Sequence, residues 1–167
     1  NEIIKIIKKY KCKYIKTGSN RTGTDRISEA ANKLKSNFDL IIDVQGDEPL
    51  IDPNHIDKVI EWHSKNKNFD IVVPHIKTKN IDTPHIVKIV QSKNKVLYFS
   101  RSLIPYQSIK KNYLKHICIY AYDPMTLKKI ISLPQSSLEK FESLEQLRWL
   151  ENGFKVNVKI TNHDSFS

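Results

Sequence analysis

The sequence predicts an α/β fold of three layers, with helices on both faces of a mainly parallel β-sheet. Short apolar runs typical of buried strands alternate with segments whose apolar residues recur at helical spacing. A stretch richer in strand patterns, residues 86–122, follows this alternation. Strands and helices that alternate along a chain favour a layered α/β architecture.

The first part of the chain predicts two helices and two strands. Residues 2–11 carry apolar side chains at helical spacing, and residues 12–16 are typical of a short strand. Residues 25–34 form an amphipathic helix that Thr22 or Thr24 can cap. The run 40–44 is almost continuously apolar, which suits a central strand buried on both faces.

Signals for helix starts and ends indicate the bounds of the predicted helices in the rest of the chain. Asp52-Pro53 and Asp123-Pro124 each combine a capping residue with a first-turn proline. Gly153 ends one long predicted helix, which covers residues 137–151. The further predicted strands are residues 71–73, 86–90, 96–99, 116–122 and 154–160.

Length and composition indicate one globular domain over residues 1–167. Apolar residues make up 39% and charged residues 28% of the chain, and no run approaches the ~18 apolar residues of a membrane span. Cys12 and Cys118 are too few for a disulfide scaffold. The sequence begins without Met in a helix-like pattern and ends after a strand-like run, so we expect it to be the interior of a longer protein.

The charge balance is basic, with 28 Lys and Arg against 18 Asp and Glu. Such a balance suits a nucleic acid, an anionic membrane or a phosphate-rich substrate. A nucleic-acid-binding domain is therefore one alternative, and it predicts basic and aromatic residues gathered on one face. The lysines are instead scattered along the chain, so we expect neither a nucleic-acid nor a membrane partner.

Two polar clusters follow predicted strands at positions where α/β folds bind ligands. In the first, Gly23, Thr24 and Arg26 lie at a helix start, where backbone N–H groups can bind an anion. The alternative is an ordinary capped turn with a solvated arginine. In the second, Gln45 and Asp47 follow the most apolar strand. Carboxylates are the ligands that Mg²⁺ prefers, although these acids can also cap the next helix.

Three further groups of polar residues lie in the second half. Arg101 follows an apolar strand and can bind a carboxylate in bidentate fashion. His116 and Tyr120 are four apart on one predicted strand, so they share a face, either as sugar ligands or as core residues. Glu142, Glu145 and Gln146 lie on the long predicted helix, where they form either a ligand site or a solvated face.

The order of these motifs resembles the 3-deoxy-manno-octulosonate (Kdo) cytidylyltransferases, also called CMP-Kdo synthetases. The resemblance covers nearly the whole chain and is more specific for the family than for the sugar. The matching segments are Thr22-Gly23-Thr24-Asp25-Arg26, Val44-Gln45-Gly46-Asp47-Glu48-Pro49-Leu50, Tyr98-Phe99-Ser100-Arg101, His116-Ile117-Cys118-Ile119-Tyr120-Ala121-Tyr122 and Leu144-Glu145-Gln146-Leu147-Arg148.

The resemblance implies a Rossmann-like nucleotidyltransferase fold with a smaller β-rich dimerisation lobe, over residues 86–122. It implies a cytoplasmic, homodimeric enzyme that joins CTP to the anomeric hydroxyl of Kdo with the help of Mg²⁺. The products are pyrophosphate and CMP-Kdo for lipopolysaccharide synthesis.

The resemblance also implies roles for individual residues. Asp47 is expected to bind Mg²⁺. Gln45 and Arg26, with the turn that holds Gly23 and Thr24, are expected near the nucleotide or the sugar. The residues expected to line the sugar pocket are Arg101, His116, Tyr120, Glu145 and Gln146. A pairing of Arg101 with the sugar carboxylate is expected from its chemistry alone.

The sequence departs from the family pattern in several places. It lacks the phosphate loop with its lysine and a second metal-binding aspartate, which the family has before and after this region. We therefore expect the 167 residues alone to be catalytically incomplete. Cys118 stands where the family usually has Gly, and Asn20 where a His is common. A sialic-acid-like or 8-amino-Kdo substrate, or a non-catalytic relative, remains an alternative.

Overall fold

The structure is a computed structural model, and it describes residues 2–46, 48, 50–78, 83–106 and 112–161. The chain forms two compact units, residues 1–37 and residues 38–167. A single domain over residues 1–167 stays a prediction, and so does a β-rich lobe over residues 86–122.

The first unit contains two helices, α1 (Glu2–Lys9) and α2 (Gly23–Leu34). The hydroxyl of Thr22 accepts a hydrogen bond from the backbone N–H of Asp25 at 3.2 Å, so Thr22 is the cap of α2. The predicted strand at residues 12–16 is wrong, because this segment has no regular structure. No described segment pairs with it, and an extended segment needs a ladder partner to persist as a strand.

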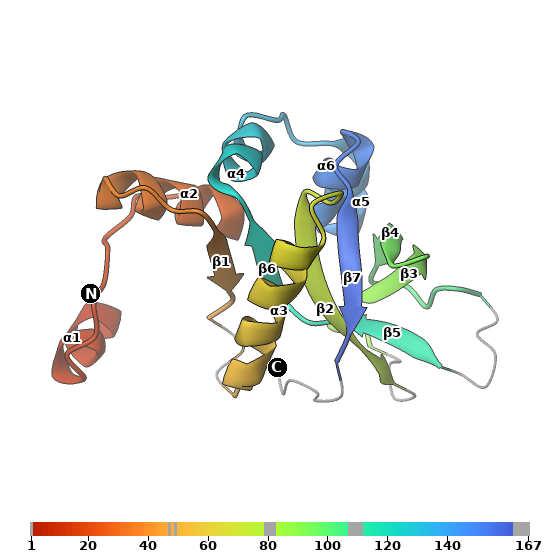
Figure 1. Ribbon diagram of the computed structural model, residues 1–167, viewed down its shortest axis with the longest axis horizontal. Coiled ribbons are helices and arrows are strands. Elements are labelled where there is room, and N and C mark those ends of the chain that lie inside the picture. Colours follow the sequence, from red (N-terminus) through yellow and green to blue (C-terminus); the bar gives the residue numbers. More distant parts are fainter. Residues whose placement is uncertain (1, 47, 49, 79–82, 107–111, 162–167) are drawn as a thin grey trace. The chain divides into compact units, whose positions relative to one another are not determined.

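The second unit combines seven described strands with four described helices (Figure 1). In the described part of the chain the longest helix has 13 residues, and none has the length and apolar character for crossing a membrane. The strands are β1 (Ile41–Val44), β2 (Ile71–Thr78), β3 (Lys88–Ser92), β4 (Lys95–Ser100), β5 (Tyr113–His116), β6 (Ile119–Tyr122) and β7 (Val156–Ile160). The helices are α3 (Pro53–Lys65), α4 (Pro124–Ile131), α5 (Ser137–Glu142) and α6 (Gln146–Glu151).

The sheet is mostly antiparallel, so the prediction of a mainly parallel sheet is wrong. The strand order is β1-β6-β2-β5-β3-β4-β7, and among the described strands only β2 and β7 pair in parallel. The reason is the position of β6, which pairs antiparallel with both β1 and β2. Strands β1 and β2 therefore run in the same direction, as their connection through α3 suggests, but they are not neighbours.

Two sequence features predicted as single elements are each divided in two. The predicted strand 116–122 is interrupted after β5, where the N–H of Ile119 donates to the carbonyl of Ile117 at 2.8 Å. The predicted helix 137–151 is interrupted between α5 and α6. Both interruptions lie beside the pocket described below, so they turn polar side chains toward it.

The hydrophobic core lies between the sheet and α3, which crosses one face of β2 and β6 in Figure 1. Five fully buried residues form its centre: Val59, Val72, Ile117, Ile119 and Ala121. Burial of each aliphatic side chain contributes about 1.5–3 kcal/mol, so this core fixes the strands on which the pocket residues stand.

Candidate functional site

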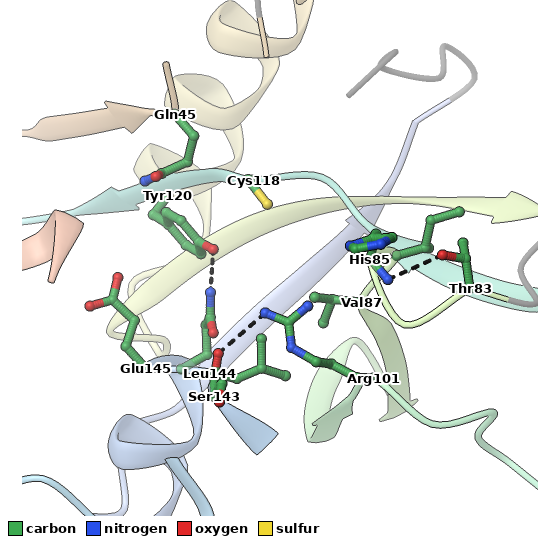
Figure 2. A pocket seen from close by; sticks show the side chains of 12 residues that line it. Gln45, Thr83, His85, Val87, Arg101, Cys118, Tyr120, Ser143, Leu144 and Glu145 are labelled. Atoms are coloured by element: carbon green, nitrogen blue, oxygen red, sulfur yellow. Dashed lines mark hydrogen bonds between the residues drawn. The ribbon is translucent and has the colours of Figure 1, made fainter. Parts of the chain in front are cut away.

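The second unit contains a pocket of about 760 Å³, a volume typical of small-molecule sites. It brings together five of the residues singled out by the sequence, from four separate segments: Gln45, Arg101, Tyr120, Glu145 and Gln146. Figure 2 shows Arg101, Tyr120 and Glu145 around it. The other lining residues are Thr83, His85, Ile86, Val87, Cys118, Ser143 and Leu144.

The interruption between α5 and α6 supplies one wall of the pocket. Ser143 adopts a left-handed backbone conformation with φ of 53°, and the N–H of Leu144 bonds back to the carbonyl of Glu139 at 3.2 Å. This ends α5, so residues 143–146 turn along the pocket instead of continuing a helix. Glu145 is therefore the N-cap residue of α6, and it does not share a helix face with Glu142.

Glu142 has a structural role, in place of the ligand site or solvated helix face that the sequence predicted. Its carboxylate accepts a hydrogen bond from the hydroxyl of Ser100 at 2.7 Å and from the backbone N–H of Arg101 at 2.9 Å. These bonds attach the end of α5 to the end of β4. Glu142 thereby fixes the backbone from which Arg101 extends.

The guanidinium of Arg101 is held in place by backbone carbonyls. It donates to the carbonyl oxygens of Glu142 at 3.0 Å, Pro84 at 2.9 Å and Ser143 at 3.3 Å. A guanidinium has five N–H groups, so these bonds within the described residues leave two N–H groups for a ligand. In Figure 2 the group lies at the pocket wall beside Ser143. It is a fixed cation suited to a carboxylate.

Tyr120 connects the pocket wall to a buried histidine. Its hydroxyl lies 2.9 Å from Nε2 of His116 and accepts a hydrogen bond from the side-chain amide of Gln146. His116 and Tyr120 lie on two strands rather than one, yet their side chains meet, as their shared face predicted. His116 is behind Tyr120 and does not line the pocket itself.

Burial sets the protonation states of His116 and Tyr120. It lowers the pKa of His116 to about 3, an effect that the carbonyl of Pro74 partly offsets. It also raises the pKa of Tyr120 well above its usual value, with a smaller contribution from nearby Cys118. At neutral pH His116 is thus neutral and Tyr120 protonated. The carbonyl oxygen of Gln146 is buried with no partner among the described residues, so it can accept a bond from a ligand hydroxyl.

Gln45 enters the pocket from the end of β1. Its amide donates to the carboxylate of Asp43 at 3.0 Å, which leaves its carbonyl oxygen for a ligand. Asp43 is buried, and burial raises its pKa to about 6, with a smaller contribution from the charge of Glu145. The hydroxyl of Tyr122, at 3.4 Å, and the amide of Gln45 oppose this shift.

A Mg²⁺ site cannot be assembled from the described residues alone. They contain no group of three or more His, Cys, Asp or Glu side chains that could hold a metal ion. Asp47, the predicted ligand, lies outside the described residues. Asp43 lies four residues before Asp47, and its carboxylate accepts hydrogen bonds from the side chains of Gln45 and Tyr122.

The predicted residues Gly23, Thr24 and Arg26 belong to the first unit. Thr24 is fully buried in the first turn of α2, and Arg26 donates to the hydroxyl of Thr17 at 2.9 Å. These contacts describe a well-ordered helix start. The role of these residues in nucleotide binding stays a prediction.

The sequence reasoning missed part of the pocket wall. Four residues of the segment 83–87 line it from the chain that leads into β3, namely Thr83, His85, Ile86 and Val87. Just after them, Lys88 is 1% exposed and is the first residue of β3. A lysine within the run Ile86-Val87-Lys88-Ile89-Val90 was the available signal, because a buried charge requires a specific set of partners.

Among its lining groups the pocket offers the held guanidinium of Arg101, the carboxylate of Glu145, the amides of Gln45 and Gln146 and the protonated hydroxyl of Tyr120. A guanidinium with two available N–H groups suits a carboxylate, and the neutral groups suit several hydroxyls. The arrangement therefore fits a small acid that carries many hydroxyl groups.

Comparisons with known proteins agree with one another. The sequence profile of a family described as cytidylyltransferase matches residues 1–160. The chain is 43% identical over 159 residues to the 3-deoxy-manno-octulosonate cytidylyltransferase of Bacteroides thetaiotaomicron, a match that covers 85% of this chain and 62% of the relative. It is 41% identical over 184 residues to that of Thermodesulfovibrio yellowstonii, with 99% of this chain and 72% of the relative covered.

A solved structure is also similar. It is a CMP:2-keto-3-deoxy-manno-octonic acid synthetase complexed with CTP, which superimposes with a TM-score of 0.86 at 31% identity. The match covers 96% of this chain and 68% of that one, and it confirms the predicted nucleotidyltransferase fold. The chain thus spans about 62% of the length of the first relative.

Proposed function

The chain belongs to the family of the 3-deoxy-manno-octulosonate cytidylyltransferases, and from this premise we propose that its protein transfers CMP from CTP to Kdo. The products are CMP-Kdo, for lipopolysaccharide synthesis, and pyrophosphate. The observation that carries the proposal is the pocket that joins the fixed guanidinium of Arg101 to Tyr120 and Gln146. Because the chain spans only part of its relatives, the activity is assigned to the product of the complete gene.

Binding of the sugar acid follows from the available donors and acceptors. The two remaining N–H groups of Arg101 bind the carboxylate, and the three carbonyls that it contacts keep the guanidinium oriented. The carbonyl oxygens of Gln45 and Gln146 accept bonds from sugar hydroxyls. Glu145 completes the polar wall, and neutral His116 holds the hydroxyl of Tyr120 in position.

The reaction is a substitution at phosphorus. The anomeric oxygen of the sugar attacks the α-phosphorus of CTP, its proton passes to water, and the bond to the pyrophosphate oxygen breaks. The pocket contributes mainly by positioning, since a well-oriented pair of reactants gains a large effective concentration. Arg101 acts here by fixing the acceptor sugar.

The remaining assignments are parts of the same proposal. Asp47 binds Mg²⁺, which when bound neutralises charge on phosphate oxygens. Gly23, Thr24 and Arg26 bind the nucleotide through the start of α2, where backbone N–H groups favour an anion. The protein acts as a homodimer in the cytoplasm, where CTP is available. Light scattering of the purified protein, which gives its molar mass in solution, tests the dimer.

Pyrophosphate release tests the proposal. The complete gene product is mixed with CTP, Mg²⁺ and, separately, Kdo, 8-amino-Kdo and a sialic acid. Release that depends on Kdo supports the proposal. Release with another acid alone keeps the reaction and changes the substrate, and the absence of release with every acid contradicts the proposal.

A further inference from the structure

Lys88 is a deeply buried cation next to the pocket. It is the first residue of β3, and 1% of its surface is exposed. Its ammonium donates hydrogen bonds to the backbone carbonyls of Thr83 at 2.8 Å, Ile86 at 2.9 Å and Arg101. Each of these three described carbonyls accepts from the same ammonium, which carries three N–H groups.

The three carbonyls come from two segments that both line the pocket. Thr83 and Ile86 belong to the wall that leads into β3, and Arg101 lies at the end of β4. The guanidinium of Arg101 makes the same connection in the other direction, because it donates to the carbonyl of Pro84 at 2.9 Å. Two cations therefore join the same two backbone segments.

We propose that Lys88 is a positioning residue for the sugar pocket. Its ammonium binds the backbone of Arg101 to the 83–86 wall, so that the guanidinium is presented to the ligand carboxylate. Lys88 touches no ligand itself and acts through Arg101. This inference rests on the proposed function, since it concerns the binding of the same sugar acid.

Lysine suits this position better than its nearest substitutes. Its three donors radiate from one compact charge, whereas the donors of arginine lie in a plane. Methionine has a similar length and no donors, so it would leave the three part-buried carbonyls without this partner. The backbone of Arg101 would then be displaced. This displacement would weaken binding of the sugar carboxylate more than binding of CTP.

The test uses Lys88→Met in the complete gene product. Lys115→Met is the matched control, because Lys115 pairs with Lys88 across the sheet and is also buried, but lies on β5, none of whose residues lines the pocket. We expect Lys88→Met to raise the KM for the sugar acid at least about ten-fold and to change the KM for CTP less than about two-fold. Lys115→Met should leave both KM values within about two-fold.

Folding of each variant is checked by circular dichroism and thermal melting. If Lys88→Met does not fold, Lys88→Arg, which keeps the charge, takes its place with the same expected split and a smaller rise. A folded variant with both KM values unchanged, or with only kcat and Tm reduced, overturns the proposal. An inactive wild-type protein instead contradicts the proposed function, so the two failures are distinguishable.

Discussion

The hydroxyl of Tyr120 lies 2.9 Å from Nε2 of His116, at the point where β5, β6 and α6 meet. The amide of Gln146 donates to the same oxygen. Burial keeps the histidine neutral and the tyrosine protonated, so the hydroxyl can donate to Nε2 while it accepts from the amide. The hydroxyl of Tyr120 is thus held in position by two side chains, His116 on β5 and Gln146 on α6.

Replacement of Tyr120 by Phe should weaken sugar binding. The variant loses the bonds to His116 and Gln146, and a loss of about 1 kcal/mol in sugar binding should raise the KM for the sugar acid about three- to ten-fold. The KM for CTP should stay within two-fold. Tyr122→Phe is the control, because its hydroxyl contacts Asp43 and does not line the pocket. Steady-state kinetics in which both variants match the wild type would contradict the assigned role.

Replacement of Arg101 by Lys should have a larger effect. Lysine keeps the charge but cannot contact three carbonyls and a carboxylate at once. The KM for the sugar acid should rise at least about ten-fold, with little change for CTP. Arg21→Lys, at an exposed ion pair with Asp25, serves as the control. Equal sugar KM values for Arg101→Lys and the control would exclude Arg101 from carboxylate binding.

Asp43 makes stability fall as pH rises. Its pKa is raised from 3.8 to about 6, so between these values the folded state binds more protons than the unfolded state. The wild type should lose about 2 kcal/mol of unfolding free energy from this group between pH 4 and pH 7. Asp43→Asn should not show this loss. Urea unfolding of both proteins at several pH values measures it, and parallel pH profiles would disprove the assignment.

His116 has the opposite effect. Its pKa is lowered from 6.5 to about 3, so the unfolded state takes up a proton first as pH falls. The group should cost about 2 kcal/mol of stability between pH 7 and pH 5. His116→Asn should be less stable than the wild type at pH 7, through lost packing, but its stability should fall less toward pH 5. The same urea series tests this, and an equally steep fall in the variant would count against it.

Removal of the metal should abolish activity. A chelator such as EDTA should stop pyrophosphate release, and added Mg²⁺ should restore it. Asp47→Asn should lower kcat at least about 100-fold, because it removes the proposed carboxylate ligand. Asp57→Asn, on the exposed side of α3, is the control. Full activity of Asp47→Asn in excess Mg²⁺ would require another ligand.

Local patterns in the sequence predicted the type of most elements. Helix α3 and helix α4 begin at the Asp-Pro pairs, and the apolar run at 40–44 contains β1. The prediction that this run is a central strand buried on both faces is wrong, because β1 stands at the end of the described strand order and is mostly half-buried. The pairing of the strands could not be predicted from these patterns, because hydrophobic periodicity does not say which strand lies next to which. The insertion of β6 between β1 and β2 was therefore missed.

The pocket was predicted in part. Motifs identified Gln45, Arg101, Tyr120, Glu145 and Gln146, and the structure brings these five together. The left-handed turn at Ser143 was not predictable, since serine has no special preference for positive φ. The contribution of residues 83–87 was also missed, because it depends on contacts between distant segments rather than on a local motif.

The most direct test of the central claim is phosphorus NMR of the reaction. The complete gene product is incubated with CTP, Mg²⁺ and Kdo, and the phosphorus-containing products are identified. We predict equal amounts of pyrophosphate and of a CMP phosphodiester to the anomeric oxygen of the sugar, with Arg101→Lys far slower at low sugar concentration. Unchanged CTP, or its hydrolysis to free CMP without sugar attachment, would contradict the account.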